Sequence, residues 1–138
     1  MASESPCTCT TLRRITRAVT ASYDEALRPA GLRITQFAIL RTLDRIGPVA
    51  VTRLAAEAAL DRSTMGRNLD PLERRGLVRI AVGEKDQRER VVHLTDAGVA
   101  AIDAAAPFWI AAQRRFAADP QAEAVIRLAD RLGAARNA

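Results

Sequence analysis

Apolar residues near the start of the chain recur every three or four positions, which is the spacing of one helix face. They fall at Leu12, Ile15, Val19, Tyr23 and Leu27. This pattern predicts a helix over Thr11–Leu27, which a proline and a glycine then end. A second amphipathic stretch predicts a helix over Thr35–Ile46, closed by a Gly-Pro pair. The next three residues, Val49–Val51, are enough for only one edge strand.

Two further helices are predicted in close succession. The first is short and is capped by Thr52, a residue type that suits a helix N-terminus. Asp61 is the expected N-cap of the second, "RSTMGRNLDPLERR", and Gly76 follows it at the usual place for a left-handed C-cap. Two helices joined by so tight a turn predict a helix-turn-helix.

A β-hairpin is predicted directly after these helices. The segments "LVRIAV" (Leu77–Val82) and "RVVHL" (Arg90–Leu94) alternate well enough to be two antiparallel strands. The charge-dense stretch between them, "GEKDQRE", is then the hairpin tip. A helix-turn-helix followed by such a hairpin is the layout of a winged helix.

The last third of the chain predicts two more helices. Thr95 and Asp96 cap a long alanine-rich helix, in which Pro107 is expected to cause a kink or a division. Asp119 and Pro120 are expected to start the final helix as N-cap and first helical residue.

Composition agrees with a mainly α protein that carries a small β-hairpin wing. The chain has 138 residues, which is the size of a single domain, 1–138. Apolar residues make up 49% of it and aromatic residues only 4%, so the core consists of aliphatic side chains, which suit close-packed helices.

The charge of the chain favours a polyanionic partner. Lysine and arginine total 21 against 16 acidic residues, giving a net charge of +5. Eight basic and five acidic residues lie between Arg62 and Arg90, so this segment alone contributes +3. Among the basic residues only Lys85 is a lysine, and the arginine fork suits phosphate and guanine better than a point charge does.

The predicted recognition helix and wing carry the candidate DNA contacts. On the helix these are Arg62, Ser63, Thr64, Arg67 and Asn68. On the wing they are Lys85, Asp86, Arg88 and Arg90. Arginine and asparagine are the residue types that bind guanine and adenine edges, and basic residues at a hairpin tip can contact phosphates or a narrow minor groove. Asp86 is expected to hold the wing arginines in position by charge-assisted hydrogen bonds. The alternative is an ordinary solvated helix face and a solvated tip.

The segments "LDRSTMGRNLDPLERRGLVRI" and "DQRERVVHLTDAG" resemble the MarR family of bacterial transcription regulators, and "LRPAGLRITQFAIL" resembles its first helix junction. The resemblance implies a homodimer in which helices of about 10–30 and 96–138 from two chains interlock. It also implies that the part over about 33–95 binds half of a pseudo-palindromic operator on double-stranded DNA, usually to repress neighbouring genes. Two-fold symmetry predicts half-sites separated by about 10 base pairs.

Two cysteines, Cys7 and Cys9, precede the first helix and are candidates for redox sensing. They could form a sulfenic acid and then a disulfide, offer two soft ligands to a metal or metalloid, or belong to an unreactive tail. The MarR family contains a hydroperoxide-sensing branch with a reactive cysteine near the start of the chain. The tyrosines that support it there are replaced here by Ile34 and Phe37.

A small aromatic or phenolic effector is the other route to regulation that the resemblance implies, in a crevice between the dimer helices and the winged part. Tyr23, Phe37 and Trp109 are the candidates for lining it, although aromatics at helical spacing are more often core residues.

No enzyme signature, cofactor motif or metal site is expected. There is no nucleophile with a plausible base, no catalytic carboxylate pair and no glycine-rich phosphate loop. His93 is the sole histidine and reads as a strand residue rather than a ligand. The sequence shows neither the basic and apolar segments of a signal peptide nor an apolar run long enough for a membrane span, which predicts a cytoplasmic protein. The competing function class is a winged-helix module that binds a protein partner instead of DNA.

Overall fold

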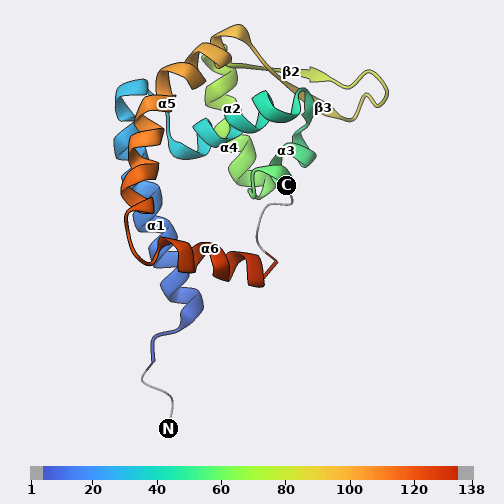
Figure 1. Ribbon diagram of the computed structural model, residues 1–138. Helices are drawn as coiled ribbons and strands as arrows, with labels where there is room; N and C mark the ends of the chain where they lie inside the picture. Colours follow the sequence, from blue (N-terminus) through green and yellow to red (C-terminus); the bar gives the residue numbers. More distant parts are fainter. Residues whose placement is uncertain (1–4, 134–138) are drawn as a thin grey trace.

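Helices dominate the computed structural model, which describes residues 5–133 (Figure 1). The elements are α1 (Thr8–Leu27), the 3-10 turn η1 (Arg28–Ala30), α2 (Ile34–Ile46), β1 (Val49–Ala50), α3 (Val51–Glu57), α4 (Arg62–Arg74), β2 (Val78–Val82), β3 (Arg90–Leu94), α5 (Asp96–Ala117) and α6 (Ala122–Arg131). The predicted mainly α fold with a hairpin is confirmed, and β1 adds a third strand to the sheet. No helix of the described range is long and apolar enough to cross a membrane.

Helices α1 and α5 lie side by side along one edge of the molecule, and α6 turns away across the far end of α1 (Figure 1). The Tyr23 ring of α1 stacks on Phe116 of α5, with ring centroids 5.1 Å apart. Of the five apolar residues that predicted α1, only Leu27 is buried in the single chain, and Ile15 is 41% exposed. The predicted helix is therefore correct, but most of its apolar face is not covered by the chain's own core.

The remaining elements form the part that carries the hairpin. The sheet order is β1-β3-β2, with both pairs antiparallel. Val92 of the central strand lies between Val49 and Ile80 and is fully buried. Strands β2 and β3 then run out together as the hairpin that projects from the molecule (Figure 1).

One aliphatic core joins the helices to the sheet. Its fully buried large side chains are Phe37, Leu27, Ile39, Leu40, Leu43, Leu54, Met65, Leu72, Val78 and Val92. They come from α1 to α4 and from β2 and β3, so the core fixes α4 against both the hairpin and the N-terminal helices. Each such side chain stabilises the fold by about 1.5–3 kcal/mol relative to exposure.

Two predicted helix caps are confirmed. The Asp61 carboxylate accepts a hydrogen bond of 2.8 Å from the Thr64 N–H at the start of α4. The Thr95 hydroxyl oxygen accepts one of 3.1 Å from the Gly98 N–H at the start of α5. Both caps satisfy amide groups that have no partner inside the helix.

Two other predicted starts were wrong. Helix α3 begins one residue before Thr52, at Val51, because pairing of β1 with β3 carries the extended chain to Ala50 and the helix follows at once. Helix α6 begins after Gln121 rather than at Pro120. The Asp119 carboxylate accepts the Gln121 N–H at 2.8 Å, so it closes a local turn instead of capping the helix.

Helix α5 is continuous over 22 residues, so the predicted division at Pro107 does not occur. Pro107 is exposed, while Ile102 before it and Trp109 after it both pack against the core. Packing on both sides of the proline thus outweighs the single helical hydrogen bond that it removes.

Candidate nucleic-acid interface

Helix α4 presents a polar face opposite its buried side. Met65, Leu69 and Leu72 are buried, whereas Arg62, Ser63 and Arg67 are exposed and Thr64 and Asn68 are half-buried. Ser63, Thr64, Arg67 and Asn68 therefore lie opposite the buried side in the N-terminal half of the helix, and Arg62 is its exposed first residue. Neither Arg62 nor Ser63 makes a side-chain hydrogen bond or ion pair within the described part of the chain, so both are available to a ligand.

The N-terminus of α4 is fixed by a small network around Asp61. The Asp61 carboxylate accepts both the N–H of Thr64 and its hydroxyl, the latter at 2.9 Å. These two hydrogen bonds hold the pKa of Asp61 below its usual value, with a smaller contribution from the positive charge of Arg67. The stabilisation that this cap gives is therefore complete above the usual carboxyl pKa, and it is lost as the pH falls through the lowered pKa of Asp61.

Thr64 also restrains the two side chains that are predicted to contact bases. The Arg67 Nη2 lies 3.4 Å from the Thr64 hydroxyl oxygen, and the Asn68 Nδ2 donates a hydrogen bond of 2.8 Å to the Thr64 carbonyl. Asn68 keeps its second amide hydrogen and its amide oxygen, which is the pair that binds adenine. The network therefore orders this helix face before any ligand arrives.

A contact that the sequence did not reveal ties α4 to the hairpin. The Glu73 carboxylate accepts a hydrogen bond of 2.9 Å from the N–H of Ile80 in β2. Strand β2 is an edge strand, so this N–H has no partner in the sheet. A carboxylate seven residues before the amide that it binds gives no recognisable pattern, because the contact depends on the turn between them.

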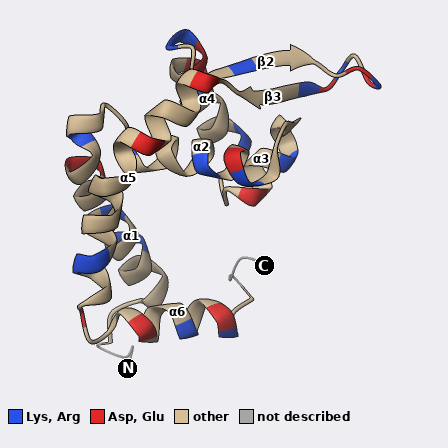
Figure 2. Cartoon of the chain, turned by 45° about the horizontal axis from the view of Figure 1, so that its top comes forward, with Lys and Arg blue, Asp and Glu red and all other residues tan. Residues whose placement is uncertain are grey.

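The hairpin tip is closed by backbone hydrogen bonds. The Gly83 N–H donates to the Glu89 carbonyl at 2.9 Å, and the Glu89 N–H donates to the Asp86 carbonyl at 3.1 Å. A β-carbon on Gly83 would lie 2.7 Å from the Asp86 carbonyl oxygen, so a glycine is needed there. The tip carries both signs of charge and extends away from the body of the molecule (Figure 2).

Asp86 has a different role from the predicted one. Its carboxylate accepts a hydrogen bond of 2.9 Å from the backbone N–H of Arg88. Among the described residues, it forms no ion pair with an arginine side chain. It therefore shapes the turn instead of holding a guanidinium group. An acid two residues before an arginine fits both arrangements, which is why the sequence alone could not separate them.

The three basic residues that were predicted as wing contacts are all exposed. Arg90 makes one long contact, from its Nη1 to the Gln87 carbonyl at 3.4 Å. The side chains of Lys85 and Arg88 form no hydrogen bond or ion pair with other residues of the range 5–133. These three cations thus lie on the hairpin that follows α4 and projects from the molecule, with blue and red segments at its tip (Figure 2).

Cys7 and Cys9 lie at the start of α1 and are both exposed. Cys7 is the N-cap residue, although its thiol makes no capping hydrogen bond of standard geometry. The backbone N–H and the hydroxyl of Thr10 favour the thiolate and lower the pKa of Cys7 below its ordinary value.

The structure brings together two of the three predicted ligand-pocket aromatics. Phe37 and Trp109 pack with ring centroids 5.8 Å apart, and the Arg41 guanidinium lies 4.3 Å from the Trp109 ring centroid. Phe37 is only 1% exposed and is a core residue. Tyr23 lies in a separate contact, where its hydroxyl donates to the Gln113 side chain and partial burial raises its pKa. Arg41 was not predicted, since nothing in its spacing marks a cation beside two rings.

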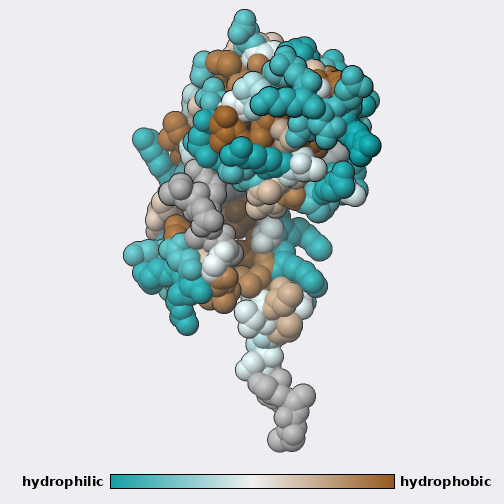
Figure 3. All heavy atoms as spheres, turned by 90° about the vertical axis from the view of Figure 1, so that its right-hand side faces the viewer, coloured by the Kyte–Doolittle hydropathy of each residue, from teal (hydrophilic) through white to brown (hydrophobic). Residues whose placement is uncertain are grey.

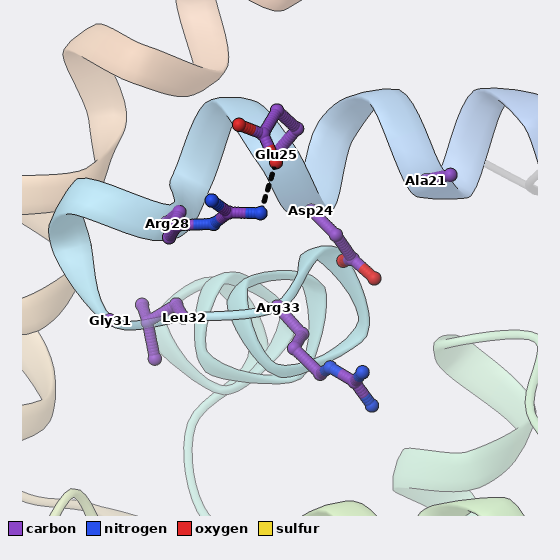
Figure 4. Close-up of a pocket in the computed structure, with 7 residues that line it drawn as sticks. All are labelled: Ala21, Asp24, Glu25, Arg28, Gly31, Leu32 and Arg33. Atoms are coloured by element: carbon purple, nitrogen blue, oxygen red, sulfur yellow. Dashed lines mark hydrogen bonds and ion pairs between the residues drawn. The ribbon is translucent and has the colours of Figure 1, made fainter.

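A surface pocket of about 440 Å³ lies instead at the junction of α1 and α2 (Figure 4). Its lining residues are Ala21, Asp24, Glu25, Arg28, Gly31, Leu32 and Arg33. Glu25 and Arg28 pair with each other, and the Asp24 carboxylate accepts the Ile34 N–H at 2.8 Å. None of the three predicted aromatics lines this pocket.

Helices α2 and α3, helix α4 with its exposed polar face, and the projecting β2–β3 hairpin together define a winged helix-turn-helix protein. The MarR family model matches residues 32–89, from α2 to the hairpin tip. The crystal structure of the transcriptional regulator MosR of M. tuberculosis in complex with DNA is similar over nearly the whole chain. It has 37% sequence identity and a TM-score of 0.81, covering 93% of this chain and 94% of that one. The chain belongs to the MarR family, whose members are transcriptional regulators and not enzymes.

Two curated relatives match over shorter stretches. The transcriptional regulator MgrA of Staphylococcus aureus is 34% identical over 89 residues, which cover 64% of this chain and 60% of MgrA. The transcriptional repressor NicR of Pseudomonas putida is 30% identical over 96 residues, which cover 70% of this chain and 61% of NicR. The chain thus matches about three fifths of the length of these relatives.

Proposed function

We propose that this protein is a sequence-specific transcriptional repressor that binds double-stranded DNA as a homodimer. The observation that carries the proposal is the exposed α4 face with Arg62, Ser63 and Arg67, set beside a wing whose Lys85 and Arg88 have no partner in the described chain. Helix α4 has the width and polarity to enter a major groove, and the wing reaches the flanking backbone or minor groove. The DNA complex of MosR and the repressor name of NicR support this assignment.

The homodimer is supported by apolar residues that the single chain leaves exposed. On the two terminal helical regions these are Ile15, Val99, Phe108, Ile110, Val125, Ile126 and Leu132. No residue of α6 is buried within the described chain, although one face of it is apolar. Hydrophobic spheres gather in the lower part of Figure 3, below the hydrophilic surface around the wing. A second copy that interlocks α1, α5 and α6 would cover such residues.

Release from DNA is proposed to follow either thiol oxidation or binding of a small aromatic effector. Oxidation would join the sulfurs of Cys7 and Cys9, with two thiols oxidised to one disulfide while a hydroperoxide is reduced to an alcohol and water. The lowered pKa and the exposure of Cys7 support this route. The effector route rests on Trp109, which is only half-buried and packs on the core residue Phe37 at the junction of α2 and α5.

The first experiment is binding of the purified protein to DNA that flanks its own gene, followed by fluorescence anisotropy. We expect tight binding whose affinity falls steeply with salt, because phosphate contacts release counterions. Repeating the titration in reductant and after mild peroxide separates the two release routes. Binding that is insensitive to salt would instead favour a winged-helix module with a protein partner.

Replacing Arg67 and Arg88 one at a time should give two different defects. Arg67→Ala should relax the preference at particular base pairs by about 1–3 kcal/mol, since a base contact is lost. Arg88→Ala should weaken binding to every sequence alike and lower the salt slope by about 1, since a phosphate contact is lost. Arg74→Ala, which removes an exposed arginine from the C-terminal end of α4 and from none of the proposed dimer helices, is the charge-matched control. If Arg67→Ala and Arg88→Ala behave alike, the division of roles is wrong.

The Cys7 thiol should ionise at a lower pH than an ordinary cysteine. In the Cys9→Ser protein, the rate of alkylation should rise with a midpoint below about 8.5, the usual thiol pKa. Unfolding in urea removes the helix N-terminus and should return the midpoint to the ordinary value, which makes it the control. A midpoint that is the same in folded and unfolded protein would contradict the lowered pKa.

A further inference from the structure

The chain turns sharply between α4 and β2, over a corner formed by Arg75, Gly76 and Leu77. Gly76 has a left-handed φ of 73°, and the Leu77 N–H donates to the Leu72 carbonyl at 2.9 Å. Leu77 is buried, so the corner is held against the core. Because the corner directly follows α4, contacts that hold the corner also fix the C-terminal end of α4.

On one side the corner is joined to the end of η1, the turn that directly follows α1. The Arg75 Nη1 donates a hydrogen bond of 2.7 Å to the carbonyl of Gly31, which is 44 residues earlier in the chain. Gly31 closes η1 with a left-handed φ of 70°, and a β-carbon there would lie 3.4 Å from the Arg75 Nη2. A charged donor makes this hydrogen bond stronger than a neutral one.

On its other side the corner touches the first turn of α5. The Thr95 hydroxyl donates to the Gly76 carbonyl at 2.6 Å, and the Thr95 N–H donates to the Leu77 carbonyl at 3.2 Å. Helix α5 also contacts η1. The end of the recognition helix is therefore linked to the two helical segments that, in the proposed dimer, meet the partner copy.

We infer that Arg75 is a positioning residue that sets the angle of α4 to α1 and α5, and thereby the half-site separation that the dimer accepts. The inference rests on the proposed function, since it concerns two recognition helices on one DNA. A small rotation of α4 about the corner would move its N-terminal end along the groove in both copies. Arg75 is exposed, so its removal breaks this link without opening the core.

The test uses an operator that the wild-type protein selects from a random duplex library. One base pair is then inserted or removed between the half-sites. The wild-type protein should prefer the selected spacing by about 10-fold or more, and Arg75→Ala should reduce this ratio to about 3-fold or less. Arg75→Lys, which keeps one charged donor, should restore part of the preference. Arg74→Ala removes the same charge one residue earlier and should leave the ratio unchanged.

The outcomes separate the inference from the proposed function. An unchanged spacing ratio in Arg75→Ala overturns the inference while DNA binding stands. A lower salt slope with an unchanged ratio also overturns it, because Arg75 would then be a phosphate contact. If the wild-type protein selects no duplex, the proposed function fails.

A second measurement tests the position of α4 without DNA. Spin labels are attached at Ser63→Cys in a protein that also carries Cys7→Ser and Cys9→Ser, and the distance between the two copies is measured. Arg75→Ala should broaden the distance distribution, whereas Arg74→Ala should not. Equal distributions in the two variants would overturn the inference.

Discussion

Placing a carboxylate on the apolar face of α6, in Ile126→Asp, should convert the proposed dimer to a monomer. Ile126 is 62% exposed in the single chain and would be covered by a second copy, where an unpaired charge is strongly unfavourable. Loss of the second recognition helix should then weaken operator binding by about 100-fold or more. Sedimentation gives the mass of the particle, and anisotropy gives the affinity.

Val82→Asp is the matched control for this change. Val82 is 52% exposed but belongs to β2, away from the three helices that are proposed to meet the partner. Its replacement should leave the oligomeric state unchanged. If Ile126→Asp still sediments as a dimer, the α6 face does not form the contact and the proposed arrangement of copies is wrong.

Gly98→Ala should destabilise the protein more than any other glycine replacement in the helices. A β-carbon at position 98 would lie 2.2 Å from the Leu77 carbonyl oxygen and 2.6 Å from a methyl group of Leu94. The first of these contacts is with backbone, which cannot rotate away. We expect the free energy of unfolding to fall by about 3 kcal/mol, which corresponds to a decrease in Tm of about 10 °C.

Gly66→Ala provides a control with the opposite sign. Gly66 also lies inside a helix, but a β-carbon there would meet nothing within 4 Å. This change should stabilise α4 by about 0.5–1 kcal/mol because alanine loses less backbone freedom on folding. Thermal unfolding followed by circular dichroism measures both variants. Equal Tm values for the two would show that α5 shifts to accept the methyl group.

Local signals explain why so much of the fold could be predicted from the sequence. Asp61, Thr95 and Gly76 act through hydrogen bonds and φ angles within a few residues of themselves, so their types and positions carry the information. Apolar spacing identified the helices and the two hairpin strands, and their predicted bounds agree with the structure to within a few residues. The Thr52 prediction was wrong because pairing of β1 with β3 starts the helix one residue earlier, and the Asp119 prediction was wrong because its carboxylate closes a turn instead.

The exposure of the candidate interface residues could be predicted from the sequence, but their contacts with the rest of the chain could not. The exposed positions of α4 and the wing follow from periodicity and from the hairpin. The bonds of Asp86, Glu73 and Arg41 depend on which atoms the folded chain brings together, and a one-dimensional pattern does not record that. The contacts of the three predicted aromatics were not predictable either. Phe37 of α2 packs on Trp109 of α5, whereas Tyr23 of α1 stacks on Phe116.

The hydrogen bond from Ile80 to Glu73 has a consequence for solubility. A three-stranded sheet has two outer strands, and each can pair with a strand of another molecule. Here β1 is only two residues long and passes directly into α3, so it offers little to pair with. On the opposite edge the Glu73 carboxylate occupies the Ile80 amide, and a negative charge stands where an invading strand would have to lie. The Glu73 carboxylate therefore blocks strand addition at the middle of the outer β2 edge, while the hairpin beyond it still projects from the molecule.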